Sequence, residues 1–92
     1  MLKADAGLMA MHDPSRSVVF AKQAVYEPGG SYPLGTNLAF YIGPQNFMVE
    51  METMAPVVTL KPGQTSTHTE TWVLASAAPQ PPDNAGLKQL FA

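Results

Sequence analysis

Two alternating runs on either side of a Pro-Gly turn constrain the fold of this chain more than any other feature. Apolar and acidic residues alternate over residues 47–54, and threonine fills most alternate positions over residues 65–74. A period of two is the side-chain period of a β-strand, and β-branched threonine favours a strand over a helix. Residues 61–64 (KPGQ) place proline and glycine at the two central positions of a turn. These runs therefore predict two strands with a chain reversal between them.

Further strand-like segments are separated by loops rich in proline and glycine. Residues 7–11 are apolar and residues 17–26 are β-branched and aromatic, and Pro14 between them favours a hairpin. Residues 27–35 contain three glycines and two prolines, which is the composition of a surface loop where a ligand could bind. The predicted fold class is all-β, a small antiparallel β-sandwich with a short C-terminal helix. Its strands are expected near residues 7–11, 17–26, 37–42, 46–53 and 65–74.

The composition of the chain changes after Leu74. The segment that follows is small and proline-rich, as in an extended linker, and Asp83 with Asn84 could cap a last helix over residues 85–91. So short a helix is not stable alone, so this tail is expected to dock on another part of the protein. We therefore expect a β-sandwich domain over residues 1–75 and a Pro-rich linker with a short C-terminal helix over residues 76–92.

Low charge and small size predict self-association. Charged residues make up 13% of the chain and hydrophobic residues 46%, whereas the charged share of a typical soluble protein is about 25%. A chain of this length buries only about 60–65% of the surface that it exposes when unfolded. Apolar surface is therefore expected to remain exposed, and a second copy, most simply in a two-fold dimer, would cover it.

Composition also argues against several partners. The net charge is −2 and the five basic residues are scattered, so nucleic acid is not an expected partner. No apolar run approaches the roughly 20 residues of a membrane span, and the N-terminus lacks a signal-peptide pattern, which predicts a cytoplasmic protein without a membrane partner. The chain has no cysteine, and its two histidines lack the spacing of metal ligands, so neither a metal nor a cofactor is predicted.

Two groups of polar side chains are candidates for a functional site. Glu50 and Glu52 point the same way along a strand, about 7 Å apart, and paired carboxylates at such a distance can act as acid and base. The simpler interpretation is that both face solvent, although methionines on the same side would raise the pKa of a carboxyl group there. His68, Glu70 and Trp72 share one face of the later run, which suits sugar binding. Alternatively, Trp72 belongs to the core and His68 to the surface.

Short motifs of the central stretch resemble the C-terminal end of galactose mutarotase-like (aldose 1-epimerase-like) proteins. They are Glu52-Thr53-Met54, residues 60–63 (LKPG) and a strand that ends in residues 72–74 (WVL). An uncharacterised bacterial branch of that superfamily resembles the chain more closely than the mutarotases do. The shared features are Tyr32-Pro33, residues 49–53 (VEMET) and the Thr-Glu-Thr-Trp ending. The resemblance covers roughly residues 10–75. It implies part of a β-supersandwich in which Glu52 is the general base that takes a proton from the anomeric hydroxyl of a sugar.

The chain departs from this family at several positions. Met54 stands where mutarotases have Gln, and the Pro-Asp-x-x-Asn segment that follows in the family is missing. The two catalytic histidines of the family belong to an N-terminal part without a counterpart here, and neither His12 nor His68 lies in a matching motif. A lone glutamate lacks the acid that returns a proton to the ring oxygen, so mutarotation by a single copy is not expected.

Three hypotheses on function follow from these observations. We prefer a non-catalytic, homo-oligomeric β-sandwich that binds a carbohydrate or another small ligand. The alternative is a mutarotase-like sugar enzyme with Glu52 as general base and a site completed by a second subunit. A third possibility is a truncated remnant or an interaction module without a ligand. The expected ligand-binding residues are Tyr32, Glu50, Glu52, His68, Glu70 and Trp72.

Overall fold

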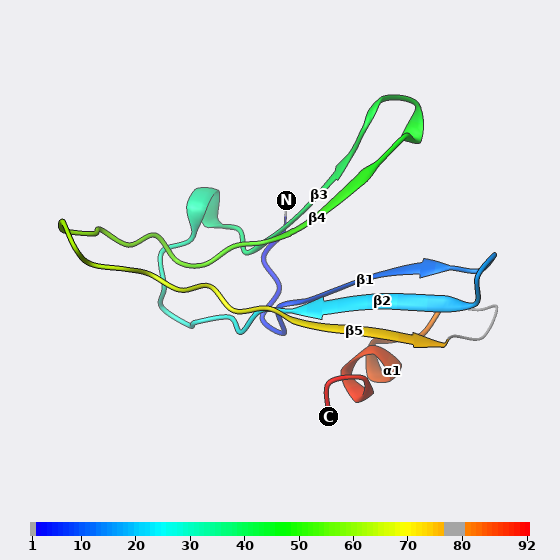
Figure 1. Cartoon of the computed structure of the whole chain (residues 1–92). Helices are drawn as coiled ribbons and strands as arrows, with labels where there is room; N and C mark the ends of the chain where they lie inside the picture. The colour runs from blue at the N-terminus through cyan, green and yellow to red at the C-terminus, as the bar shows by residue number, and fades with distance from the viewer. Residues whose placement is uncertain (1, 77–80) are drawn as a thin grey trace.

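Five strands, one short α-helix and two single 3-10 turns, η1 (Pro33–Gly35) and η2 (Pro44–Asn46), make up the regular structure of the described residues. The computed structural model describes residues 2–76 and 81–92. One antiparallel sheet has the order β1-β2-β5, and β3 and β4 form a separate antiparallel hairpin (Figure 1). The predicted all-β class is confirmed. The elements are β1 (Leu8–Asp13), β2 (Val18–Gln23), β3 (Leu38–Ile42), β4 (Val49–Thr53), β5 (Thr71–Ser76) and α1 (Asn84–Gln89).

The predicted hairpin near the N-terminus is confirmed as β1 and β2. β1 extends to Asp13, two residues beyond the predicted strand, because this side chain organises the turn that follows. Its carboxylate accepts hydrogen bonds from the Ser15 amide at 3.0 Å and the Ser15 hydroxyl at 2.6 Å, and pairs with Arg16 at 2.7 Å. The Ser15 and Arg16 hydrogen bonds lower the pKa of Asp13 to about 2.

The helix α1 covers one face of the three-stranded sheet. Its first turn is capped as the sequence predicts, because the Asp83 carboxylate accepts a hydrogen bond from the Gly86 amide at 2.8 Å. The helix lies against the sheet on the side away from the hairpin (Figure 1). We call this side the outer face of the sheet, and Val19 and Ala21 are buried there. The predicted docking of the tail is thus made within the chain, while residues 77–80 of the predicted linker lie outside the described residues.

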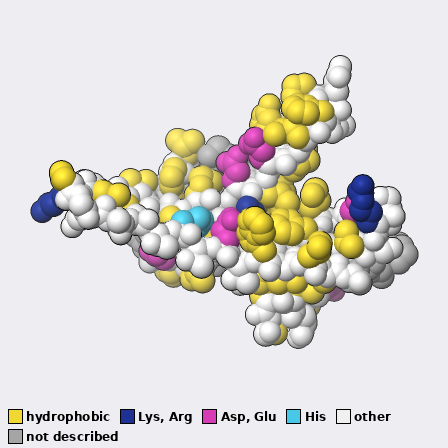
Figure 2. All heavy atoms as spheres, in the orientation of Figure 1, with side chains coloured by type: hydrophobic (Ala, Val, Ile, Leu, Met, Phe, Trp, Pro, Cys, Tyr) yellow, Lys and Arg dark blue, Asp and Glu magenta, His cyan; other side chains and the backbone are white. Residues whose placement is uncertain are grey.

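The other face of the sheet looks toward the β3–β4 hairpin across an open cleft. Strand pairing places Met9, Met11, Phe20, Lys22, Trp72 and Leu74 on this inner face of the sheet. The inner face of the hairpin carries Leu38, Phe40, Ile42, Val49, Met51 and Thr53, while its outer face carries Ala39, Tyr41, Glu50 and Glu52. The ribbons of the two sheets meet at one end and diverge toward the other (Figure 1). The space-filling view shows open space between the hairpin and the sheet (Figure 2), which we call the inter-sheet cleft. A closed sandwich is therefore not confirmed in the single chain.

Residues 55–70 form an extended arm that leaves the two sheets. The predicted reversal at its tip is confirmed, because Gly63 has a φ of 84° and the Gln64 amide donates to the Lys61 carbonyl at 3.0 Å. The predicted strand over residues 65–74 is wrong in its first half, since β5 begins only at Thr71. Residues 65–70 keep the composition of a strand, but in the described chain no strand lies beside them to form a ladder. The radius of gyration is 15.1 Å, against about 12 Å for a compact chain of this length.

The predicted strand over residues 46–53 also starts too early. Gln45 and Asn46 have φ values of 56° and 57°, so the chain turns tightly there and β4 begins at Val49. The predicted strand over residues 37–42 is confirmed almost in full by β3. No helix of the described residues has the length and apolar character needed to span a membrane.

Gly7 is expected to be the least replaceable glycine of the fold. Its φ is 62°, its carbonyl accepts a hydrogen bond from the Ala24 amide, and an added Cβ would lie 1.9 Å from the Ala24 carbonyl oxygen. Gly7→Ala is therefore expected to lower the free energy of unfolding by roughly 2–4 kcal/mol, as measured by urea denaturation. The matched control is Gly63→Ala, which also has positive φ but open space around it, so it should cost only the roughly 1–2 kcal/mol of the left-handed backbone. Equal losses in the two variants would contradict this packing.

Candidate functional site

The Glu70 carboxylate joins the hairpin to the sheet at the base of the inter-sheet cleft. One carboxylate oxygen accepts a hydrogen bond from the Thr53 hydroxyl at the end of β4 and pairs with Lys22 of β2, at 3.1 Å from Nζ. The other accepts from the Trp72 indole nitrogen at 3.1 Å. The Thr53 hydroxyl also lies 2.7 Å from Nε2 of His68. These five residues, which we call the Glu70 cluster, come from both sheets and from the end of the arm.

Burial explains the ion pair at the centre of this cluster. Lys22 is 8% exposed and lies in the middle of the sheet, where a cation without a partner would be costly. Glu70 provides the opposite charge. The Thr53 hydrogen bond, followed by those of Trp72 and Lys22, lowers the pKa of Glu70 to about 2, although partial burial acts in the opposite direction. Glu70 is therefore ionised over the ordinary range of pH.

The Thr53 hydroxyl fixes the orientation of His68. A hydroxyl has one proton, and here it is donated to the Glu70 carboxylate, so the Thr53 oxygen accepts from Nε2–H of the imidazole. A neutral His68 then carries its proton on Nε2 and presents Nδ1 as a hydrogen-bond acceptor. The chain from Glu70 through Thr53 to His68 thus orients an imidazole in the same way that carboxylates orient functional histidines elsewhere.

His68 also lines a shallow cavity beside the base of the arm. The cavity has a volume of about 240 Å³ and lies between the end of β2 and the two extended segments of the arm. Apolar side chains, Ala24, Val25, Ala55 and Pro56, form part of its wall. The polar groups of the wall come from Gln23, Glu27, Thr67, His68, Thr69 and Thr71. We call this the His68 cavity.

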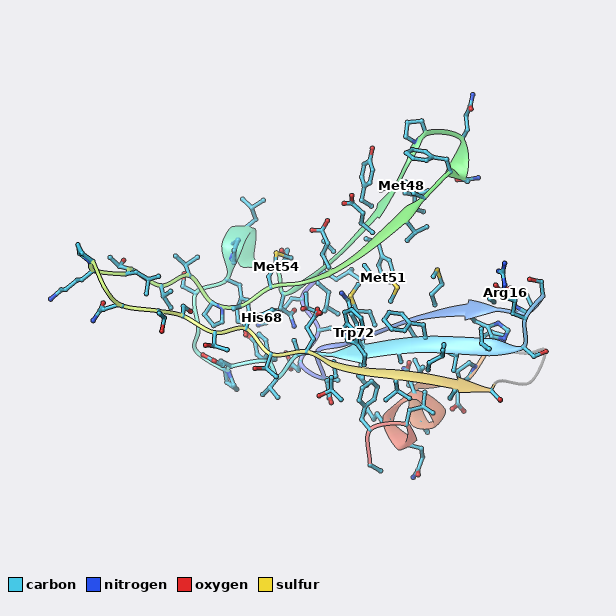
Figure 3. The ribbon with its side chains drawn as sticks, in the orientation of Figure 1. Arg16, Met48, Met51, Met54, His68 and Trp72 are labelled. Carbon is cyan, nitrogen blue, oxygen red and sulfur yellow. The ribbon has the colours of Figure 1, made fainter. Side chains whose placement is uncertain are left out.

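Trp72 is exposed although its ring is held on two sides. The Trp72 residue is 65% exposed, so its interpretation as a core residue is wrong for the single chain. The interpretation of His68 as a surface residue is confirmed, since His68 is exposed. Its ring meets Phe20 edge to face with centroids 5.6 Å apart, and its indole nitrogen is bound to Glu70. Figure 3 shows Trp72 rising from the sheet and Met51 descending from the hairpin toward it. The grouping of His68, Glu70 and Trp72 predicted from sequence is therefore present, through hydrogen bonds centred on Glu70.

Glu50 and Glu52 form a separate acidic pair. Both are exposed on the outer face of the hairpin, opposite Tyr41 and Ala39 of β3. The hydrogen bond with Glu52 raises the pKa of Glu50 most, and partial desolvation and then the charge of Glu52 raise it further. Because side chains alternate along β4, this pair points away from the face that holds Thr53. The structure thus separates the acidic pair from the Glu70 cluster.

Tyr32 also lies apart from the other candidate residues. It is buried, stacks on Tyr26 with ring centroids 5.2 Å apart, and its hydroxyl accepts a hydrogen bond from the Glu27 amide at 2.9 Å. It borders a smaller cavity of about 120 Å³ that shares no residue with the His68 cavity. These contacts give Tyr32 a role in shaping the loop of residues 27–35.

Sequence reasoning missed Lys22 and Thr53 as members of the cluster. A lysine within the apolar run VVFAKQ is itself a signal, because a lysine buried in a sheet needs an acidic partner. Thr53 shares the inner side of β4 with Met51. The resemblance of the Glu-Thr-Met motif to the family motif instead points to its neighbour Glu52 as the functional residue. Within the described residues, no group of three histidine, aspartate or glutamate side chains is placed to hold a metal ion.

Comparisons with protein-family models, with curated proteins and with solved structures found no match to this chain.

Replacing Glu70 tests the cluster through the pH dependence of stability. The folded-state pKa of Glu70 is depressed, so its stabilisation is present above the unfolded value of about 4.5 and is lost as pH falls toward 2. Glu70→Gln is expected to lower the free energy of unfolding at pH 7 by about 1–3 kcal/mol. The difference from the wild type should shrink between pH 4.5 and 2, as measured by denaturant titration at several pH values.

The matched control is Asp13→Asn, which removes the exposed ion pair with Arg16 at a turn. Solvent screens this pair, so the loss at pH 7 is expected to be smaller than for Glu70→Gln. A Glu70→Gln variant as stable as the wild type at every pH would contradict the proposed importance of the cluster.

Proposed function

We propose that the protein is a non-catalytic, self-associating β-protein that binds a small hydroxylated ligand, with carbohydrate as the expected class, in the His68 cavity. The observation that carries this proposal is the oriented imidazole. His68 is held by Thr53 and Glu70 and borders a cavity lined by hydroxyl, amide and carboxylate side chains. A histidine fixed in this way at a polar concavity suits recognition of hydrogen-bonding groups.

The chemistry of the His68 cavity supports a ligand rich in hydroxyl groups. Each hydroxyl of a sugar can donate one hydrogen bond and accept others, and threonine, glutamine, histidine and glutamate supply the complementary groups. The volume of about 240 Å³ lies below the range of about 300–1,000 Å³ that is typical of drug-sized ligands. This size favours a ligand near that of a single sugar ring. The resemblance of the central stretch to mutarotase-like proteins also supports a carbohydrate.

A binding role is favoured over catalysis by the position of Glu52. The alternative enzyme needs this residue as a base beside a bound sugar, yet Glu52 lies exposed on the outer face of the hairpin. The His68 cavity is lined by other residues. Self-association is supported by the many large apolar side chains that the single chain leaves exposed, among them Trp72 and Leu74.

Ligand binding is tested by NMR titration of the labelled protein with a panel of simple monosaccharides. Amide shifts are expected for Gln23 and for residues 67–69, and His68→Ala should abolish them because the oriented acceptor is lost. The matched control is His12→Ala, since His12 lies in β1 and not in the cavity wall. Saturable shifts confined to other regions, or binding that survives His68→Ala unchanged, would contradict this site.

The alternative enzyme is tested by anomer interconversion of common aldoses, followed by polarimetry. The wild type is expected to show no interconversion above background, and Glu52→Gln should leave both the fold and this result unchanged. Glu50→Gln is the matched control, because it removes the neighbouring carboxylate on the same face. Clear interconversion that depends on Glu52 would overturn the non-catalytic role and favour the mutarotase-like alternative.

A further inference from the structure

We propose that a second copy of this chain fills the inter-sheet cleft, with the hairpin of each copy packed on the inner sheet face of the other. This docking rests on the self-association in the proposed function and identifies the inter-sheet cleft as the surface through which the copies associate. It makes a two-fold contact in which both copies use the same residues. Within one copy the hairpin leaves the sheet at an angle (Figure 1). Inner-face residues such as Met9 and Leu38 are buried, whereas Ile42 and Leu74 are 60% and 72% exposed.

Both walls of the inter-sheet cleft are apolar and exposed. Figure 2 shows hydrophobic side chains gathered on the hairpin and on the sheet below it, with open space between them. The exposed residues are Phe40, Ile42 and Val49 on the hairpin and Met11, Trp72 and Leu74 on the sheet, each between 43% and 72% exposed. Monomeric soluble proteins rarely leave two facing apolar surfaces of this kind in water.

The surface area of the chain is consistent with a dimer. The accessible surface is 6624 Å², whereas a compact monomer of 9.8 kDa exposes about 5,200 Å². The excess is thus about 1,400 Å² per copy. This excess, to which the arm contributes, is larger than the roughly 800 Å² per partner of a standard interface.

The charges around the inter-sheet cleft allow it to close without an unpaired ion. Lys22 on the inner sheet face is already paired with Glu70 at the base. Asp13, at the far end of β1, is paired with Arg16. Glu50 and Glu52 lie on the outer face of the hairpin and would stay in solvent. The hairpin of one copy and the sheet of the other can therefore meet without like charges in contact, and the net charge of −2 adds little repulsion between copies.

Two charge substitutions test the contact. Leu74→Glu on the sheet and Ile42→Glu on the hairpin are each expected to weaken association about 100-fold or more, because each places an unpaired carboxylate in the interface. Mass is measured by light scattering and sedimentation at micromolar concentration. Leu34→Glu is the matched control, since Leu34 is 85% exposed and belongs to neither inner face. This control should remain a dimer, and Leu74→Thr, which keeps strand propensity, should weaken association about tenfold.

Mixing two variants shows whether the faces meet between copies. Ile42→Glu and Leu74→Lys proteins should each be monomeric alone, and a dimer mass should return when they are mixed. One hairpin–sheet contact is then wild type and the other joins opposite charges. If the hairpin instead closes on the sheet of its own copy, the measured mass does not change when the two variants are mixed.

The outcomes separate this docking from the proposed function. A wild type that is monomeric at micromolar concentration overturns both the docking and the self-association. A dimeric wild type whose mass is unchanged by Leu74→Glu and by Ile42→Glu keeps the self-association and overturns only the docking. A mixture that stays monomeric overturns the exchange of hairpins.

Discussion

The hydrogen-bonded carboxylate of Glu70 is the interaction on which the arrangement of this molecule depends. It neutralises the buried ammonium group of Lys22 in the sheet and accepts the hydroxyl proton of Thr53 at the end of the hairpin. It thereby holds two separate sheets together at one end. The same carboxylate orients the Trp72 indole directly and the His68 imidazole through Thr53. The pair of Lys22 and Glu70 thus contributes both to the junction of the two sheets and to the geometry of the candidate site.

Because the two sheets are joined at one end only, their apolar inner faces are left exposed toward the other end. The outer face of the sheet is covered within the chain by α1, whereas the inner faces diverge and stay in contact with water. Closing the inter-sheet cleft would bury this surface at no cost in unpaired charge. The His68 cavity lies at the base of the arm, and its wall contains neither Trp72 nor the exposed residues of the hairpin. The proposed ligand site and the proposed contact between copies therefore lie on different surfaces.

Local patterns in the sequence predict the parts of the fold that depend on neighbouring residues. The helix cap at Asp83, the Pro-Gly turn, the first hairpin and the alternation of Glu50 and Glu52 on one face of a strand are all confirmed. The strand predicted over residues 65–74 is wrong in its first half, because threonine favours a strand only where another strand is present to pair with it. His68 and Glu70 are nevertheless brought together, through Thr53, which sequence reasoning missed. Exposure of Trp72 could not be predicted, because it depends on the angle between the sheets.

The fluorescence of Trp72 tests most directly whether a second copy fills the inter-sheet cleft. Trp72 is the sole tryptophan of the chain and lies within this cleft. If a second copy fills the cleft, the emission at micromolar concentration is that of a buried indole with little quenching by acrylamide. Dilution should then shift the emission to longer wavelength and increase quenching as the copies separate. An indole that is equally exposed to quencher at every concentration, in a folded protein, would contradict the claim.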